Sequence, residues 1–158
     1  STVLYRQFFK NNMKHIAAEL KTVVAEYTTR FSELQEPEWA AKPNPAKWSK
    51  KEVLGHLIDS ALNNHRRFVV TQYIQNQNIV YDQDQWVALQ DYQNADTRAL
   101  IQLWRLLNLQ IAGILETMPE SVWNTRCDTG KNGEELHTLE WLAADYIPHM
   151  KHHLGQIF

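Results

Sequence analysis

The chain has 158 residues, a formal net charge of −2 at pH 7 and a single cysteine. Such a charge argues against a protein whose main task is to grip nucleic acid, because that task needs a concentrated positive surface. One cysteine allows no intramolecular disulfide, so we expect a reducing, cytoplasmic compartment. No run of about 18 apolar residues occurs, so no membrane span is predicted. The opening sequence STVLYRQFFKNN also lacks the basic head and apolar stretch of a secretory signal.

The scarcity of turn-forming residues predicts long secondary-structure elements. Five glycines and five prolines among 158 residues are roughly half of the usual share of about 12%. The length suits one domain with its own core, which we place over residues 1–158.

The first predicted helix runs from about Val3 to Leu34. Its apolar residues recur every three or four positions, as on one face of a helix. The members of this stripe are Phe9, Met13, Ile16, Leu20, Val23, Tyr27, Phe31 and Leu34. Residues 35–48 then hold three of the five prolines and are predicted to break the helix.

The second predicted helix begins after Ser49 and continues to about Gln75. Ser49 is followed three residues later by Glu52, which is the spacing of a capping box. Its apolar stripe comprises Leu54, Leu57, Ile58, Ala61, Leu62, Phe68 and Val69. The polar residues 76–84 are predicted to end it.

Two further helices complete the predicted fold. The third begins near Asp96 or Thr97 and ends before Pro119; residues 119–137 form a loop, and Thr138 caps the last helix. No segment alternates convincingly as a strand. We therefore predict an all-α four-helix bundle whose helices are joined by long connections of about 14 to 20 residues.

The last helix carries two histidines on one face. His149 and His153 are four residues apart, so their side chains stack one turn apart and can bind one metal ion. Seven histidines placed at random in this chain would give roughly 0.3 such pairs, so histidines satisfied in the core or by solvent are an equal alternative. Met150 stands where the zinc-protease motif has glutamate, so no protease is predicted.

The second helix supplies a candidate third ligand in His56. Helical spacing places His56 on a polar strip, whose other members are Glu52, Asp59, Ser60, Asn63 and Arg67. Two interpretations of this strip stay open: an ordinary solvated helix face, or the wall of a polar cleft with His56 as a metal ligand.

The two helices together resemble a known family. Residues 48–60 read Trp-Ser-x6-His-x2-Asp-Ser, and residues 149–156 read His-x3-His-x2-Gln. This combination is similar to the DinB/YfiT-like superfamily, and Asn63, Arg67-Phe68, Tyr81 and Trp86 are smaller echoes of it. The resemblance implies a four-helix bundle that binds a divalent metal through His56, His149 and His153, and that pairs as a homodimer.

Three imidazoles on one ion leave at least one open position, as in catalytic rather than structural sites. Imidazole suits several transition metals; zinc or nickel is expected, zinc first. Pro148 directly precedes one expected ligand, removes a backbone donor and clashes with the carbonyl of Ala144. We therefore expect a kink beside the site, with two open consequences: it re-aims His149, or it spoils the ligand geometry of His149.

Two enzymatic functions and one non-enzymatic function follow for such a site. A hydrolase would need a base near a metal-activated water, for which Glu52 or Asp59 is the candidate, unless Asp59 only orients His56. A thiol transferase needs less, because a metal ion deprotonates a bound thiol outright. The resemblance favours transfer of a low-molecular-weight thiol such as bacillithiol to an electrophilic small molecule. Two interpretations of Arg67 stay open: it holds a carboxylate of the thiol or substrate, or it is an ordinary surface arginine. The alternative is a non-catalytic, stress-related bundle that binds metal or dimerises.

Other chemistry-bearing residues are given lesser roles. Cys127 is expected in a polar loop as an incidental residue, and His15, His65 and His137 have no partner at ligand spacing. His152 is expected to point to solvent or to lie behind the ligands. Trp86 could line a substrate pocket, and most of the six tryptophans are expected to pack in the core or in a lid.

Overall fold

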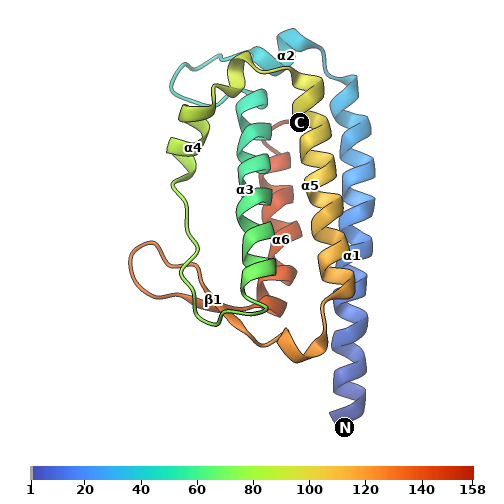
Figure 1. The fold of residues 1–158 in the computed structure, drawn as a ribbon. Helices are drawn as coiled ribbons and strands as arrows, with labels where there is room; N and C mark the ends of the chain where they lie inside the picture. The colour runs from blue at the N-terminus through green and yellow to red at the C-terminus, as the bar shows by residue number, and fades with distance from the viewer. Residues whose placement is uncertain (1) are drawn as a thin grey trace.

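Four long helices form the body of the protein, as predicted (Figure 1). The computed structural model describes residues 2–158, and it describes side chains from Asn12 onward, so the predicted core position Phe9 lies outside the described side chains. The four helices are α1 (Thr2–Glu33), α3 (Lys50–Val70), α5 (Thr97–Thr117) and α6 (Leu139–Leu154). None of the helices within residues 2–158 is long and apolar enough to cross a membrane.

The order of the helices around the bundle differs from their order in the chain. Helix α5 packs against both α1 and α3, and α6 packs against both α3 and α1. The consecutive helices α1 and α3 therefore occupy opposite corners. Helices α3 and α5 run in the same direction (Figure 1), so the chain must return along the length of the bundle between them. This return explains the long predicted connection.

The predicted helix starts are confirmed by their caps. The Ser49 hydroxyl accepts a hydrogen bond from the Glu52 backbone N–H at 3.1 Å, and Asp96 caps α5. The Thr138 hydroxyl accepts from the Trp141 N–H, also at 3.1 Å. Each cap satisfies an N–H group that the first helical turn leaves unpaired. Helix α3 ends at Val70, earlier than predicted, and residues 71–73 form a turn.

The apolar stripes meet in one core between the four helices. Phe31 of α1 is fully buried and contacts Trp104 of α5 edge-on, with ring centroids 5.1 Å apart. Trp39 packs on the same phenylalanine, at 5.5 Å. It lies in a short helix, α2 (Glu36–Ala40), within the segment predicted only as a break. Most positions of the predicted stripes are buried, but the prediction is wrong for Leu62 and Val69, which are 39% and 37% exposed because they lie on the outer side of α3.

The connections contain more structure than the sequence analysis predicts. Residues 71–96 include α4 (Gln83–Gln90) and the short helix η1 (Tyr92–Asn94), and residues 118–138 include η2 (Glu120–Val122). The stretch 119–137, predicted as a loop, also forms an antiparallel hairpin of β1 (Arg126–Asp128) and β2 (Leu136–Thr138). Three-residue strands are too short for an alternating pattern to be recognised.

The hairpin loop is closed by its own polar contacts. The Asp128 carboxylate accepts from the backbone N–H groups of Gly130 and Glu135, both at 2.9 Å. A Cβ at position 130 would lie 1.7 Å from the Gly133 carbonyl oxygen, so only glycine fits there. Cys127 is fully buried in β1, and its predicted placement in a polar loop is wrong because strand pairing turns its side chain inward.

Candidate metal centre

His56 lies on the inner face of α3, about two turns from the start of the helix. Its side chain is 1% exposed. The Trp48 ring lies near it with a centroid distance of 5.2 Å, and the His153 ring of α6 lies 4.5 Å away at an interplanar angle of 74°. Both ring nitrogens of His56 are buried and have no hydrogen-bond partner among the described residues. Such unpaired polar atoms are costly unless a ligand satisfies them.

The two histidines of α6 are adjacent to each other and to His56. The rings of His149 and His153 have centroids 5.1 Å apart. His153 is half-buried and His149 is exposed. Helix α6 continues through Pro148 as a single helix, so the proline does not interrupt the helical spacing of these two residues.

The three rings are neighbours but do not yet converge on one point. Within residues 2–158, no three His, Cys, Asp or Glu side chains are already placed to ligate one ion. Because His149 is exposed and His153 half-buried, their side chains have room to change rotamer toward His56. The unpaired nitrogens of His56 fit a metal ion, which would satisfy one of them.

Burial keeps His56 in the neutral form that a metal needs. Desolvation, followed by the nearby His153 and His149, lowers the pKa of His56 to about 4. Desolvation also lowers the pKa of His153, although its hydrogen bond to Gln156 opposes this. Neutral imidazole is the ligand form, so both rings are ready to bind at neutral pH.

The polar strip on α3 faces inward, so its interpretation as an ordinary solvated face is wrong for most of its members. Asp59, Ser60 and Asn63 are all buried. The Asp59 Oδ1 atom accepts from the Tyr92 hydroxyl at 2.6 Å and from Gln90 Nε2 at 2.8 Å. Asp59 makes no hydrogen bond to His56, and its Oδ2 is buried without a partner in the described part of the chain. Burial raises the pKa of this carboxyl group against the opposing effect of those two donors.

Tyr92 reaches Asp59 through a gap that a glycine leaves in α3. A Cβ on Gly55 would lie 2.2 Å from Tyr92 Cδ2, so the ring lies directly on the helix backbone beside His56. Gly55 therefore allows η1 to dock against the residues that flank the candidate ligand.

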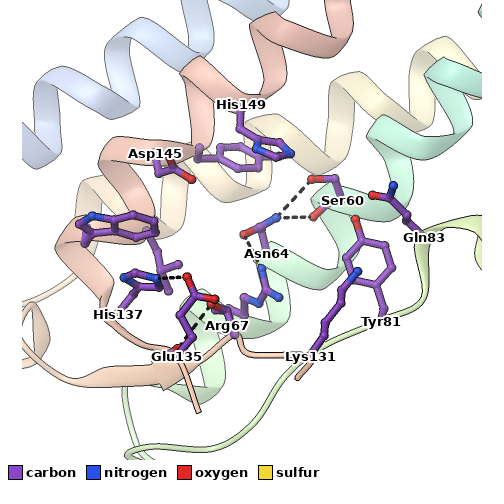
Figure 2. Close-up of a pocket in the computed structure, with 14 residues that line it drawn as sticks. Ser60, Asn64, Arg67, Tyr81, Gln83, Lys131, Glu135, His137, Asp145 and His149 are labelled. Atoms are coloured by element: carbon purple, nitrogen blue, oxygen red, sulfur yellow. Dashed lines mark hydrogen bonds and ion pairs between the residues drawn. The ribbon is translucent and has the colours of Figure 1, made fainter. Parts of the chain in front are cut away.

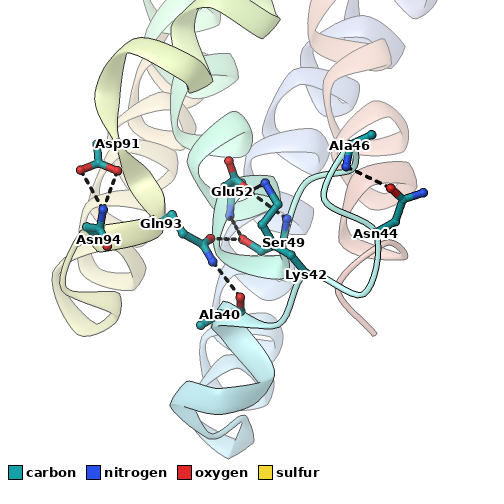
Figure 3. A network of polar contacts seen from close by, with 9 residues as sticks. All are labelled: Ala40, Lys42, Asn44, Ala46, Ser49, Glu52, Asp91, Gln93 and Asn94. Carbon is teal, nitrogen blue, oxygen red and sulfur yellow. Dashed lines mark hydrogen bonds and ion pairs between the residues drawn. The ribbon is translucent and has the colours of Figure 1, made fainter.

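Glu52 is occupied at the start of α3 (Figure 3). Its Oε1 accepts from the Ser49 backbone N–H at 3.0 Å and from Lys42 Nζ at 2.9 Å. Burial would raise the pKa of Glu52, but the Lys42 and Ser49 contacts outweigh it and lower the pKa. These contacts give Glu52 a structural role at the helix terminus.

A cavity of about 280 Å³ opens beside His149 (Figure 2). Helices α3 and α6, the segment around Tyr81 and the β1–β2 hairpin form its walls. His137 stacks on Trp141 with centroids 3.6 Å apart, and its Nε2 forms an ion-pair contact with the Glu135 carboxylate at 3.0 Å. The Lys131 ammonium lies 5.7 Å from the Tyr81 ring centroid. The hairpin thus brings residues to the site that their sequence spacing does not indicate.

Arg67 also lines this cavity, and part of its guanidinium group is hydrogen-bonded to the protein backbone. Its Nε and Nη2 donate to the Ile79 carbonyl at 3.0 and 2.7 Å, and Nη1 lies 3.5 Å from Asn64 Oδ1. No carboxylate lies within ion-pair distance of Arg67 in the part of the chain that the structure describes. Burial lowers the pKa of Arg67.

The chain matches the model of a known family. The model of the DinB superfamily matches residues 19–157, and the chain belongs to this superfamily. A Bacillus licheniformis protein is 26% identical over 80% of this chain and 72% of its own. YfiT of Bacillus subtilis is 28% identical over 70% of this chain and 62% of its own. The names of both relatives give them a provisional assignment as metal-dependent hydrolases.

Solved structures show the same fold. The YfiT structure, described as an unusual four-helix bundle, superposes with a TM-score of 0.72 at 22% identity, over 96% of this chain and 83% of that one. A mycothiol-dependent maleylpyruvate isomerase superposes with a TM-score of 0.67 at 10% identity. That match covers 89% of this chain but only 58% of the isomerase, which therefore carries a substantial further part. The fold class predicted from the sequence is confirmed.

Proposed function

We propose that this protein binds one divalent metal ion through His56, His149 and His153 and transfers a low-molecular-weight thiol to an electrophilic small molecule. The observation that carries the metal site is the pair of unpaired, buried nitrogens of His56, which lies beside the two ring neighbours from α6. The provisional names of both relatives, which call them metal-dependent, support the same assignment. Zinc or nickel suits an all-imidazole ligand set.

The chain's own residues prepare this site in three ways. Burial keeps His56 neutral, Trp48 covers one side of its ring, and the exposed His149 connects the ligand set to the cavity. A bound ion of this kind would supply the acidity that converts a thiol to its thiolate. The residues themselves would hold the ion, exclude water from His56 and leave one side open to a small molecule.

The carboxylate contacts favour thiol transfer over hydrolysis. A hydrolase needs a free base within hydrogen-bond reach of the attacking water. Glu52 is held by Ser49 and Lys42, and one oxygen of Asp59 is held by Tyr92 and Gln90. A metal-activated thiol requires no such base. The contacts that hold Glu52 and one oxygen of Asp59 therefore count against hydrolysis and not against thiol transfer.

One observation keeps hydrolysis as the second candidate. Asp59 Oδ2 is buried without a partner in the described region, and burial raises the pKa of this carboxyl toward the range of a useful base. Asp59 would serve a hydrolase as the base only if that oxygen reached the water.

The cavity indicates the kind of molecule that would bind. Arg67 and Lys131 bring two cationic groups to its lining, and neither has a carboxylate within ion-pair distance among the described side chains. Glu135 and Asp145 also line it, but Glu135 already contacts His137. We therefore place an anionic group of the thiol or the substrate near Arg67 and Lys131.

The test compares the metal-loaded with the metal-free protein. The zinc or nickel form is incubated with monochlorobimane and a carboxylate-bearing thiol, and the fluorescent adduct is followed. We expect adduct formation above the uncatalysed rate only with metal, and loss of most of it in His149→Ala. Ester cleavage without thiol would instead support the hydrolase, and neither reaction with metal firmly bound would support a non-catalytic metal-binding bundle.

The assembly belongs to the same proposal. We expect one domain over residues 1–158 and a homodimer in the cytoplasm. Light scattering of the purified protein measures the mass directly, and a monomer at all concentrations tested would contradict the dimer.

A further inference from the structure

Gln156 contacts the Nδ1 nitrogen of the His153 ring. His153 Nδ1 and Gln156 Oε1 are 3.2 Å apart. An amide oxygen only accepts hydrogen bonds, so Nδ1 must carry the hydrogen for this contact to form. In neutral imidazole the other nitrogen then carries the lone pair. The contact therefore leaves Nε2 of His153 as the nitrogen that can bind a metal ion.

The turn that carries Gln156 is held firmly against the bundle. The Gln156 N–H donates to the His153 carbonyl at 2.9 Å, and the next residue, Ile157, is fully buried. Phe158 stacks on Phe31 of α1, with centroids 5.8 Å apart and planes inclined by 14°. These contacts fix the backbone of residues 155–158, so the Cα of Gln156 is held in a defined position beside His153.

The same turn is tied to the helix that carries His56. Lys50 is the first residue of α3, and its ammonium donates to the carbonyl of Ile157. His56 lies less than two turns further along α3, and its ring packs edge-on to that of His153. One turn therefore links both helices that supply the candidate ligands.

We propose that Gln156 is a positioning residue that selects the Nδ1-protonated tautomer of His153 and so presents Nε2 to the metal ion. This inference rests on the proposed metal site. Hydrogen bonds to the outer nitrogen of a ligating histidine fix its tautomer and orientation, and their loss lowers metal affinity by about 10–100-fold. The half-buried position of His153 limits how far water can replace the amide.

The experiment compares two substitutions of Gln156 with a matched control. Gln156→Leu removes the acceptor at similar size, and Gln156→Glu keeps an acceptor at the same reach. Gln110→Leu is the control, because Gln110 is exposed on α5. Zinc affinity is measured by competition with a chromophoric chelator at mildly alkaline pH. The tautomer of His153 is read from long-range nitrogen–proton NMR spectra of the metal-free protein.

We expect Gln156→Leu to weaken zinc binding by about 10–100-fold and to lose the Nδ1-protonated tautomer. Gln156→Glu should keep both properties, and Gln110→Leu should change neither. Unchanged affinity and tautomer in Gln156→Leu, with His153→Ala strongly impaired, would overturn the role of Gln156 alone. Unchanged affinity in His153→Ala would overturn the proposed ligand set itself, and with it the role of Gln156.

Discussion

The ring of His56 stands edge-on to the ring of His153, with centroids 4.5 Å apart and planes inclined by 74°. This contact joins the buried face of α3 to the end of α6. The ring nitrogens of His56 make no hydrogen bond to any described residue, so their burial destabilises the fold. A residue that is costly to the fold and adjacent to two similar side chains is typical of a binding site.

The first prediction follows from this cost. Replacing His56 with leucine removes two unpaired buried nitrogens at similar volume. The free energy of unfolding of the metal-free protein should rise by about 1–2 kcal/mol, and its melting temperature by a few degrees. Thermal denaturation with and without zinc measures both states, and zinc should no longer raise the melting temperature of the variant.

His65→Leu is the matched control, since His65 is half-buried on the same helix and is not a proposed ligand. It should keep the full stabilisation by zinc. A metal-free His56→Leu protein that unfolds more easily than the parent would show that His56 is a structural residue of the core.

The second prediction concerns Gly55. Alanine at this position would place its Cβ 2.2 Å from Tyr92 Cδ2, so Tyr92 must move and release Asp59. We expect a loss of about 1–3 kcal/mol in unfolding free energy from this overpacking. Gly113→Ala is the control: apart from the adjacent residues and the local backbone of its own helix, no described atom would lie within 4 Å of a Cβ at this position, so it should stabilise the protein by about 0.5–1 kcal/mol. Urea denaturation measures both, and equal effects would contradict the docking of Tyr92 on α3.

The third prediction is a pH dependence that comes from Asp59. Burial raises its pKa, so the folded state holds the proton more tightly than the unfolded state does. The ionised carboxylate therefore costs stability at neutral pH, and this cost disappears as pH falls toward the ordinary range of about 4. Asp59→Asn keeps an acceptor for Tyr92 and Gln90 but removes the charge.

Asp59→Asn should raise the free energy of unfolding at neutral pH by on the order of 1 kcal/mol, and the melting temperature by a few degrees. The gain should shrink as the pH is lowered. Asp145→Asn on the exposed side of α6 should show no such trend. A variant that is less stable than the parent at neutral pH would mean that the Asp59 charge has an unrecognised partner.

The fourth prediction separates the roles given to Glu52. Glutamine at the third helical position still completes a capping box, so Glu52→Gln should lose only the Lys42 ion pair. Its unfolding free energy should fall by less than about 1 kcal/mol, and its metal-dependent activity should stay within about threefold of the parent. Activity assays with the zinc form test this, and a loss of two orders of magnitude would restore Glu52 as a catalytic base.

Local patterns were sufficient to predict the four helices. The caps at Ser49 and Thr138 are confirmed because a side chain three residues from its target acts within one turn. The capping-box spacing of Ser49 and Glu52 already indicated a structural role for Glu52. That role makes Glu52 a weaker candidate for a catalytic base. Helical periodicity placed His149 and His153 together for the same local reason.

The rest of the site depends on contacts between distant segments. Three such contacts join segments that are far apart in the chain. Tyr92 docks on Gly55, Arg67 donates to the Ile79 carbonyl, and the hairpin places Lys131 at the cavity. No pattern within a helix or strand encodes them. Gln156 is different, because its spacing of three from His153 was visible in the sequence, but its role needed the ring orientation.

The amount of metal bound per chain tests the central claim most directly. The purified protein is reconstituted with zinc or nickel, freed of excess ion and analysed for metal beside His149→Ala. The account predicts one ion per chain in the parent and far less than one in the variant. A parent protein that stays far below one ion per chain, or a variant that binds as much as the parent, would contradict it.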